Sequence, residues 1–419
     1  MDITLHQPHF AKKIAAPTSK SAAHRQMIAA AFAGAPTNIH FTQSCDDIVA
    51  TARCLRALGA GVEERADGLL VTPSAENPES AVCDCGESGS TLRFLLPVAA
   101  ALGIKTTFLR RGRLPQRPLE PLVSVLCEHG ANVEEGEMGA ITVSGRLQPG
   151  QYAIEANVSS QFITGLLFAL SLLPQPSTLL LKGPIESAPY INMTLETLTT
   201  FKAPPIAAGG GRLLGVPGYL AQPLRSPGSI NTEGDYSGAA FLLAAGAIGK
   251  ESVTVTGLSY PSTQGDMAIL DLLDRFGASI DLDEETKAFT VSPSTLKGIQ
   301  IDAKQIPDLV PVLAVVAAVA DGDTEITGAA RLRDKESDRL ATTAAMLRAL
   351  GGEVEEREDG LLIHGGKSLL GGVVDGAKDH RIVMSAAVAS LVCQDAVTIT
   401  DAQAADKSFP SFFKTAIRH

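Results

Sequence analysis

The sequence has no tryptophan, and aromatic residues make up only 5% of its 419 positions. Positive charge is also scarce, because 35 lysines and arginines are set against 46 aspartates and glutamates, for a formal charge of −11. Such an acidic chain repels a phosphate backbone, so we expect no nucleic-acid partner and any anion site must be local. The longest apolar runs, such as 309–320, fall short of the roughly 18 to 20 residues that cross a bilayer. We therefore expect a soluble protein without a membrane partner.

Cysteine is infrequent and scattered. Of the six cysteines, only Cys83 and Cys85 are close in sequence, and no second pair stands at metal-ligand spacing. The first ten residues contain neither a basic stretch nor an apolar stretch of the kind found in export signals. We expect reduced thiols in a cytoplasmic protein that holds no metal.

An internal repeat is the clearest pattern in the chain. The stretch LRALGAGVEERADGLLVTP from Leu55 recurs as LRALGGEVEEREDGLLIHG from Leu347, with 13 of 19 positions identical. Weaker copies start at Val125, Thr197 and Leu272. Their aligned turn positions are 71, 72, 75 and 74 residues apart, at Gly59, Gly130, Lys202, Gly277 and Gly351. Regular self-similarity of this kind predicts a repeat architecture.

Each repeat has the same predicted elements: an Ala/Leu-rich helix, a β-branched strand, a second helix, and two short strands around a turn. In the first repeat these elements are Ala22–Ala33, Thr37–Thr42, Asp46–Leu58, Val62–Arg65 and Leu69–Thr72. The remaining first helices begin near Ser90, Ser160, Tyr236, Ile306 and His380. The sequence therefore predicts six α/β repeats.

The sixth repeat is incomplete, since its predicted second helix, Phe409–Ile417, reaches the end of the sequence. The N-terminal strand Asp2–Gln7 can supply the missing strand. We therefore predict one domain at 19–232 and another formed by 1–18 plus 233–419, joined by hinge crossings near 17–19 and 231–234. A six-repeat solenoid that binds a protein on its concave face is the alternative at this point.

Small polar residues gather where the predicted helices begin. The stretches are 17–25, 86–93, 157–165, 233–238, 306–311 and 378–384 at first helices, and 116–122, 186–193, 334–340 and 405–410 near second helices. Helix capping alone explains the polar residues. It does not explain the accompanying cations Lys20, Arg25, Arg117, Lys335, Arg339, Arg381 and Lys407. Cations beside helix N-termini favour a polyanionic ligand.

No Walker loop, nucleophile elbow or metal-binding helix appears, and histidine is sparse in these stretches. Acid and base chemistry is therefore assigned to carboxylates or lysines.

Six ordered motifs resemble the enolpyruvyl transferases, and among them the 5-enolpyruvylshikimate-3-phosphate (EPSP) synthase family. The motifs are SKSAAHR at Ser19–Arg25, VSSQF at Val158–Phe162, EGD at Glu233–Asp235, KESDR at Lys335–Arg339, DHR at Asp379–Arg381 and KSFP at Lys407–Pro410. The resemblance covers nearly the whole chain. It implies two similar domains, each of three βαβαββ units with the helices inside, an inside-out α/β barrel that closes over a cleft.

The resemblance also implies the reaction, which is transfer of the enolpyruvyl group of phosphoenolpyruvate to the 5-hydroxyl of shikimate 3-phosphate, without a cofactor, in a monomer. By motif, shikimate 3-phosphate is bound by Lys20, Ser21, Arg25, Ser159, Ser160, Gln161, Ser187, Asp308 and Lys335. Phosphoenolpyruvate is bound by Lys20, Gly89, Arg117, Gln161, Arg339, Arg381 and Lys407. Asp308 is the implied base, Glu336 the implied acid, and Lys20 the third implied catalytic residue.

Several positions depart from the family pattern, namely Thr18, Glu87, Ser90, Phe94, Arg331 and Ala377. The extra carboxylate of Glu87 is the one expected to weaken phosphoenolpyruvate binding, unless it points away or pairs with an arginine. In this family the inhibitor glyphosate occupies the phosphoenolpyruvate site beside the helix start, here Gly89 and Ser90. A bulky ring at Phe94 is expected to tilt that helix.

Three rival functions share this fold or part of it. The transferase that acts on UDP-N-acetylglucosamine has a Lys-Asn pair, whereas Lys20 is followed here by Ser21. It also has a cysteine in its mobile loop, and 109–116 contains none. RNA 3′-phosphate cyclases are disfavoured by the −11 charge. A non-catalytic binding protein of this fold would lack one of the acids, bases or cations named above.

Overall fold

The computed structural model describes residues 1–418. The chain divides into two compact units, one formed by residues 20–232 and the other by 1–19 together with the chain from 233 onward. We call them the 20–232 unit and the split unit. None of the helices in the described part of the chain combines the length and hydrophobicity needed to span a membrane.

The 20–232 unit contains three four-stranded sheets of one design. In each, the first strand runs parallel to the second, and the two remaining strands are antiparallel additions. The strand orders are β15(Ser229–Asn231)-β4(Thr37–His40)-β6(Gly68–Thr72)-β5(Gly61–Arg65), β7(Ser80–Asp84)-β8(Lys105–Leu109)-β10(Ile141–Gly145)-β9(Ala131–Glu135) and β11(Gln151–Glu155)-β12(Ser177–Lys182)-β14(Leu213–Val216)-β13(Ile206–Ala208). The helices, in pairs, are α1(Lys20–Ala31) and α2(Asp46–Ala57), α3(Gly89–Leu102) and α4(Leu122–Glu128), and α5(Ser160–Ser171) and α6(Ala188–Thr200).

The split unit repeats this design in two four-stranded sheets, and its third sheet has three strands. Its sheets are β3(Lys13–Ala15)-β16(Val253–Thr256)-β18(Ala288–Ser292)-β17(Ser279–Asp283), β19(Gln300–Asp302)-β20(Asp323–Thr327)-β22(Gly360–His364)-β21(Glu353–Arg357) and β1(Ile3–Leu5)-β24(Val397–Ile399)-β23(Gly372–Val374). Its α-helices are α7(Tyr236–Ile248), α8(Ile269–Phe276), α9(Val310–Val319), α10(Arg339–Ala349) and α11(His380–Ala389). Short 3₁₀ segments precede or replace helices at η4(Gly265–Ala268), η5(Pro307–Leu309), η6(Ala330–Asp334) and η7(Ala402–Lys407).

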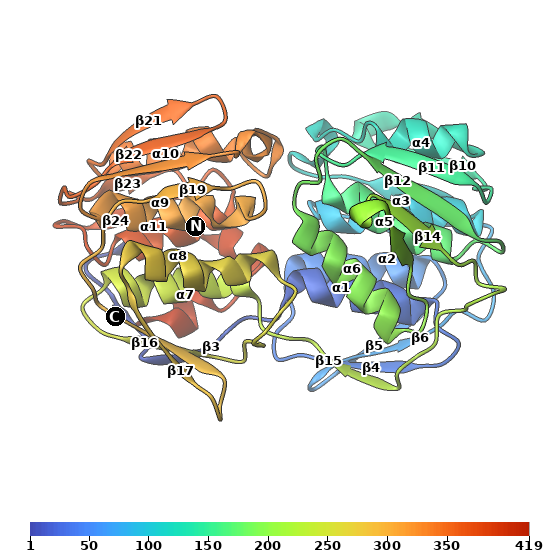
Figure 1. The fold of residues 1–419 in the computed structure, drawn as a ribbon, viewed down its shortest axis with the longest axis horizontal. Helices are drawn as coiled ribbons and strands as arrows, with labels where there is room; N and C mark the ends of the chain where they lie inside the picture. Colours follow the sequence, from blue (N-terminus) through green and yellow to red (C-terminus); the bar gives the residue numbers. More distant parts are fainter. Residues whose placement is uncertain (419) are drawn as a thin grey trace. The chain divides into compact units, whose positions relative to one another are not determined.

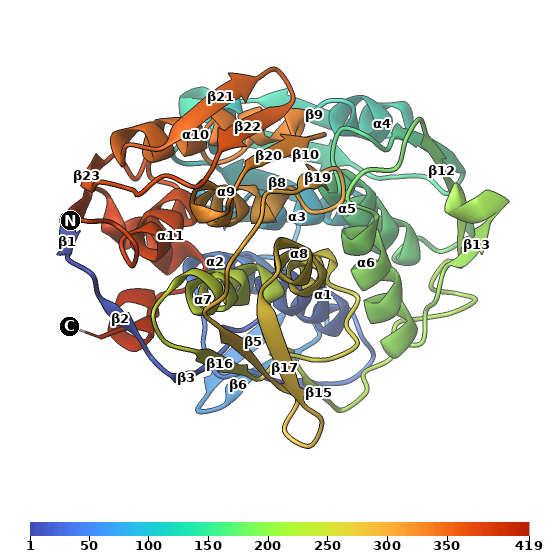
Figure 2. The same ribbon diagram turned by 60° about the vertical axis from the view of Figure 1, so that its left-hand side comes forward.

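The helices lie inside each unit and the sheets outside, as Figures 1 and 2 show for α7, α9 and α11 between the sheets of the split unit. The sequence requires this arrangement because α7 and α9 are apolar on every side and all but their last residues are buried. The sheets instead alternate, as in β21, where only Val354 is buried. The core of each unit is therefore a packed helical centre.

The first strand of each four-stranded sheet was absent from the residue-based prediction. Two of these strands, β3 and β15, do not join the sheet of the repeat that follows them in the sequence. Strand β3 precedes the first repeat in sequence, yet it pairs in parallel with β16 of the fourth. Strand β15 precedes the fourth repeat and pairs with β4 of the first. The two chain crossings follow directly after β3 and β15.

The sixth repeat is completed by the N-terminus, as predicted. Strand β1 pairs antiparallel with β24, with Ile3 opposite Ile399. The predicted helix Phe409–Ile417 is wrong, because only a five-residue π-helical segment, η8(Phe412–Ala416), forms there. Ile417 is taken instead by strand β25(Ile417–Arg418), which pairs with β2(His9–Phe10).

Candidate active site

Four segments of the split unit contribute to one charged cluster. Asp308 lies in η5, Glu336 just before α10, Arg381 in the first turn of α11, and Lys407 at the end of η7. Arg339 is at the centre and is only 1% exposed. Its guanidinium donates to Asp308 at 2.8 Å, to Glu336 at 2.7 Å and to Asp379 at 2.8 and 3.2 Å.

The same carboxylates contact the other predicted cations. Asp308 lies 3.2 Å from Arg381 and 3.6 Å from Lys335, and Glu336 lies 3.6 Å from Lys407. Four cations thus surround the three carboxylates of Asp308, Glu336 and Asp379. The structure brings together every site residue that we predicted in this unit, and the cluster has an excess of positive charge.

The ionisation of Asp308 is set by its neighbours. Burial alone raises the pKa of this carboxyl, but the charges of Arg381, Lys335 and Arg339 outweigh it and hold the pKa well below its usual range. Asp308 is therefore ionised in the ligand-free site and has the charge that a general base needs.

Asp379 has a supporting position in this cluster. It is fully buried, caps α11 by accepting from the Arg381 N–H at 3.0 Å, and also accepts from the Ser337 hydroxyl at 2.9 Å. Burial raises its pKa, and Arg339 with His380 more than offsets this, so the pKa is lowered overall. Asp379 thus fixes Arg339 between Asp308 and Glu336.

A second buried acid, Asp266, was missed from the sequence. It lies in η4, is 2% exposed, and accepts a hydrogen bond from the Ser237 hydroxyl. Burial, followed by the charge of Asp308, raises the pKa of Asp266 to about 7, although Arg381 acts in the opposite direction. Its Oδ1 has no hydrogen-bond partner in the described structure. The stretch QGD in a loop carries no sequence signal that distinguishes it from an ordinary turn.

The second cluster lies in the 20–232 unit, where Lys20 opens α1. Its ammonium pairs with Asp47 of α2 at 2.9 Å, and both side chains are largely buried. Asp47 was not predicted, although two acidic residues in the first turn of α2 were a visible signal. The pairing holds Lys20 in position next to the helix start.

Arg25 is buried and strongly tethered. Its guanidinium donates to Ser21 O at 2.7 Å, Thr194 at 2.9 Å, Tyr190 O at 2.9 Å and Thr164 at 3.2 Å. Desolvation lowers its pKa to about 10, so it stays charged at neutral pH. Four of its five N–H groups are thus engaged by α1, α5 and α6.

Gln161 and Arg117 both lie against the start of α3. The amide oxygen of Gln161 accepts from Arg93 at 2.8 Å, and its amide nitrogen donates to Ser90 at 3.0 Å. A β-carbon on Gly89 would lie 2.7 Å from the Arg117 guanidinium, so glycine is what lets Arg117 approach the helix start. Arg93 was missed, although an arginine four residues after Gly89 lies on the same helix face.

The remaining predicted residues of this unit are serines at helix starts. Ser159 caps α5 and accepts from the Gln161 N–H at 3.3 Å, and Ser160 follows it. Ser187 precedes α6 in a left-handed conformation, with φ of 54°. A non-glycine residue in that region stores strain, and such strain is concentrated at functional sites.

The departures from the family pattern have defined places. Glu87 is exposed and its carboxylate lies against Gly112, in the loop that precedes η1(Leu114–Gln116). Phe94 is 1% exposed and packs edge-on against His24 and beneath Arg25. Arg331 donates to Lys304 O at 3.1 Å.

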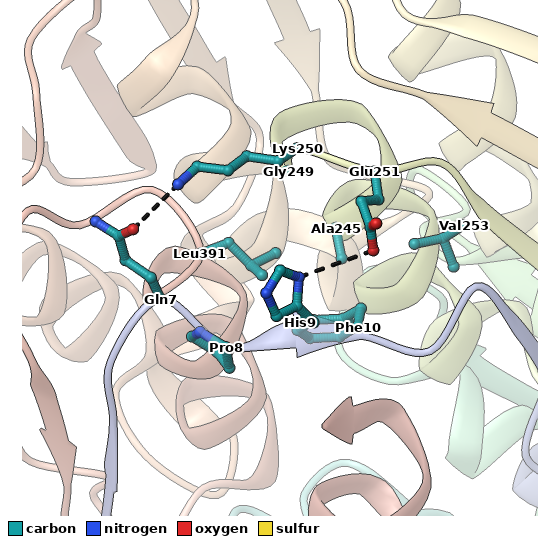
Figure 3. Close-up of a pocket in the computed structure, with 10 residues that line it drawn as sticks. All are labelled: Gln7, Pro8, His9, Phe10, Ala245, Gly249, Lys250, Glu251, Val253 and Leu391. Carbon is teal, nitrogen blue, oxygen red and sulfur yellow. Dashed lines mark hydrogen bonds and ion pairs between the residues drawn. The ribbon is translucent and has the colours of Figure 1, made fainter. Parts of the chain in front are cut away.

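A small cavity of about 80 Å³ also opens in the split unit, beside strand β2 and the end of α7 (Figure 3). Its polar groups pair with one another, since Lys250 donates to Gln7 at 3.0 Å and His9 lies 3.8 Å from Glu251. None of the predicted site residues lines it. Among residues 1–418, no group of three or more His, Cys, Asp or Glu side chains is placed to hold a metal ion.

The fold is that of the enolpyruvyl transferases. The enolpyruvyl transferase NikO from Streptomyces tendae superposes over 100% of this chain and 98% of its own with a TM-score of 0.78, at 18% identity. The EPSP synthase of Acinetobacter baumannii superposes over 99% of this chain and 96% of its own, with a TM-score of 0.80 and 26% identity.

Sequence comparison narrows this class to one family. A sequence model described as EPSP synthase (3-phosphoshikimate 1-carboxyvinyltransferase) matches residues 6–416. Proteins named 3-phosphoshikimate 1-carboxyvinyltransferase from Clostridium kluyveri and Halorubrum lacusprofundi are 39% and 38% identical, over 95% and 99% of this chain and 92% and 96% of theirs. The chain belongs to the EPSP synthase family. It is a transferase of the shikimate route to aromatic compounds, and the UDP-N-acetylglucosamine alternative is not favoured.

Proposed function

We propose that the two clusters described above carry the family's reaction, in which the enolpyruvyl group of phosphoenolpyruvate is moved to the 5-hydroxyl of shikimate 3-phosphate and phosphate is released. The observation that supports this most strongly is the Arg339 cluster. Its central guanidinium contacts two carboxyl groups, Glu336 and the ionised Asp308, and cations are in excess. The cations of this cluster can bind two anionic substrates, and its two carboxyl groups can carry out two proton transfers.

In the addition step, Asp308 takes the proton of the 5-hydroxyl as that oxygen bonds to C2 of phosphoenolpyruvate. Glu336, which must be protonated in the complex with both substrates, delivers its proton to C3, and a tetrahedral intermediate with a methyl group results. In the elimination step, Glu336 recovers a proton from that methyl group while the C2–O bond to phosphate breaks. The departing phosphate takes the proton held by Asp308, so both carboxyls return to their starting states.

Substrate binding is expected to strengthen the base. In the ligand-free site, Arg339, Arg381 and Lys335 depress the pKa of Asp308. When substrate phosphate and carboxylate groups take over those cations, less positive charge acts on Asp308 and its pKa rises. Catalysis would then begin only when both anions are bound.

The remaining assignments follow the motifs. We assign Ser21, Arg25, Ser159, Ser160 and Ser187 to shikimate 3-phosphate, with Asp308 and Lys335 from the split unit. Phosphoenolpyruvate is assigned to Gly89, Arg117, Arg339, Arg381 and Lys407, and both substrates are assigned to Lys20 and Gln161.

Because each assigned set draws on both units, binding is expected to bring the units together, with the crossings near 17–19 and 231–234 acting as hinges. Compaction on adding shikimate 3-phosphate, measured by small-angle scattering, supports this arrangement, and an unchanged radius of gyration at saturation argues against it.

We further propose a cytoplasmic monomer, in keeping with six cysteines that are all free thiols. Sedimentation of the purified chain tests the oligomeric state, and a dimer at working concentration would contradict it.

The direct test of function is phosphate release by the purified chain with phosphoenolpyruvate and either shikimate 3-phosphate or UDP-N-acetylglucosamine. Release only with the first acceptor, unaffected by a chelator, is expected. Asp308→Asn and Glu336→Gln should each lower kcat by about 10²- to 10⁴-fold, the usual contribution of proton transfer. Glu353→Gln, on an exposed strand of the same unit, is the matched control. Unchanged kcat in either active-site variant removes that residue from the mechanism.

A further inference from the structure

A chain of buried hydroxyls connects His24 to the start of α3. His24 lies in α1 between Lys20 and Arg25 and is 0% exposed. Its Nδ1 lies 2.6 Å from the hydroxyl of Thr51 in α2, which lies 2.7 Å from the hydroxyl of Thr91 in α3. Thr91 in turn donates to the hydroxyl of Ser88 at 2.8 Å. Ser88 is the residue that caps α3, directly before Gly89.

The direction of these hydrogen bonds can be worked out, because each hydroxyl has a single proton. The proton of Thr91 is used on Ser88, so Thr51 must donate to Thr91. The proton of Thr51 is then also used, and the ring nitrogen Nδ1 of His24 must donate to Thr51. His24 is therefore the tautomer with its proton on Nδ1. The opposite tautomer would leave two hydroxyl oxygens 2.7 Å apart with no proton between them.

The charge state of His24 agrees with this assignment. Burial lowers the pKa of His24 to about 3, and Lys20 and Arg25 lower it further against the opposing charge of Asp47. The ring is neutral at working pH, and its Nε2 is left as a buried acceptor that has no partner in the described structure. An unsatisfied buried group costs about 1 to 3 kcal/mol, so an ordinary core position would favour an apolar side chain.

We propose that His24 is a positioning residue for phosphoenolpyruvate binding. Through Thr51 and Thr91 it holds Ser88 as the cap acceptor and thereby fixes the start of α3. Ser88 accepts both the Thr91 hydroxyl and the Thr91 N–H, the latter at 3.3 Å. The close approach of Arg117 to Gly89 leaves little tolerance for movement of that helix start. This inference rests on the proposed assignment of Gly89 and Arg117 to phosphoenolpyruvate.

The test compares Thr51→Val with Thr51→Ser. Valine keeps the volume of threonine and removes the hydroxyl, whereas serine keeps the hydroxyl and loses a methyl group. We expect Thr51→Val to raise the KM for phosphoenolpyruvate about tenfold, equivalent to roughly 1.4 kcal/mol. The KM for shikimate 3-phosphate should stay within about twofold, and Thr51→Ser should restore the wild-type value. His24→Leu should raise the KM for phosphoenolpyruvate as Thr51→Val does. His24→Asn should keep the wild-type value, because the asparagine amide can donate from near the Nδ1 position.

Thr106→Val is the matched control, since Thr106 is also 0% exposed in the same unit and hydrogen-bonded, to Ile104 O at 3.1 Å. It should lose stability without raising the KM for phosphoenolpyruvate. An equal rise in both KM values for Thr51→Val, or a serine variant worse than the valine variant, would overturn the proposal in favour of simple packing. If Thr51→Val fails to fold, the proposal is tested on Thr51→Ser and His24→Asn, whose KM for phosphoenolpyruvate should equal that of the wild type.

A spectroscopic measurement is independent of activity. In the ¹⁵N spectrum of histidine-labelled wild-type protein, His24 should show a protonated Nδ1 and an unprotonated Nε2, unchanged between pH 5 and pH 8. A protonated Nε2 overturns the inference. Absence of any phosphate release by the wild type would instead refute the proposed function, so the two failures are distinguishable.

Discussion

Replacing Gly89 with alanine tests whether the start of α3 forms part of the phosphoenolpyruvate site. The new β-carbon would lie 2.7 Å from Nη1 and 3.2 Å from Cζ of Arg117, and 3.2 Å from Nη1 of Arg93. Ordinary contact begins near 3.4 Å, so Arg117 must move by about 0.7 Å, the difference between 3.4 and 2.7. A displacement of about 1 Å at a positioning group can cost up to about 10²-fold in rate.

The fold should tolerate this change. The atoms in the way are at the end of a flexible side chain, and alanine is favoured over glycine in a helix by up to about 1 kcal/mol. We therefore expect an unchanged or higher melting temperature together with a rise of about three- to tenfold in the KM for phosphoenolpyruvate. Glyphosate is longer than phosphoenolpyruvate, so its inhibition constant should rise further, by at least about tenfold more than that KM.

Steady-state kinetics with glyphosate as a competitive inhibitor is the assay, and Gly34→Ala is the control, because nothing lies within 4 Å of a β-carbon there. Equal rises in the inhibition constant and the KM would refute the placement of Gly89 in this site. Inhibition of the wild type that is not competitive with phosphoenolpyruvate would do the same.

Two further predictions concern buried carboxyls. The pKa of Asp266 is about 7 in the folded protein against an ordinary 3.8, so the native state binds the extra proton and stability is lost as pH rises from about 4 to 7. The three-unit difference in pKa corresponds to at most about 4 kcal/mol. In urea unfolding, the free energy of unfolding of Asp266→Asn should therefore increase relative to that of the wild type across this pH range. A difference that stays constant with pH contradicts this prediction. Asp379→Ala breaks a buried ion pair and should cost about 3 to 5 kcal/mol, whereas Asp338→Ala, which removes the half-exposed cap of α10, should cost about 1 kcal/mol; similar losses would argue against the Arg339 cluster.

The repeat and the helix starts could be predicted from the sequence because both are local. The spacing from Gly59 to Gly351 marks the turns, and α2 begins at the predicted residue, Asp46. Strands β3 and β15 could not be found, since three residues are too few to show alternation. Only pairing with β16 and β4, far away in the sequence, defines them.

The residues of the candidate site could likewise be predicted only in part. Cations at helix starts were visible as residue types in motifs, so Lys20, Arg339 and Arg381 could be named. Asp47, Arg93 and Asp266 were missed because their importance depends on what lies opposite them in space. The terminal segment after Pro410 was mispredicted as a helix, because strand pairing of Ile417 with β2 competes with helix formation.

The central claim is that Glu336 protonates C3 of phosphoenolpyruvate while Asp308 activates the 5-hydroxyl. Running the reaction in D₂O and analysing the product by mass spectrometry and proton NMR tests it most directly. Addition followed by elimination creates a methyl group that exchanges one position with solvent, so deuterium should appear on the methylene carbon of the enolpyruvyl product. Glu336→Gln should form the deuterated product about 10²- to 10⁴-fold more slowly than the wild type. A wild-type product that contains no deuterium, formed at the normal rate of phosphate release, would contradict the account.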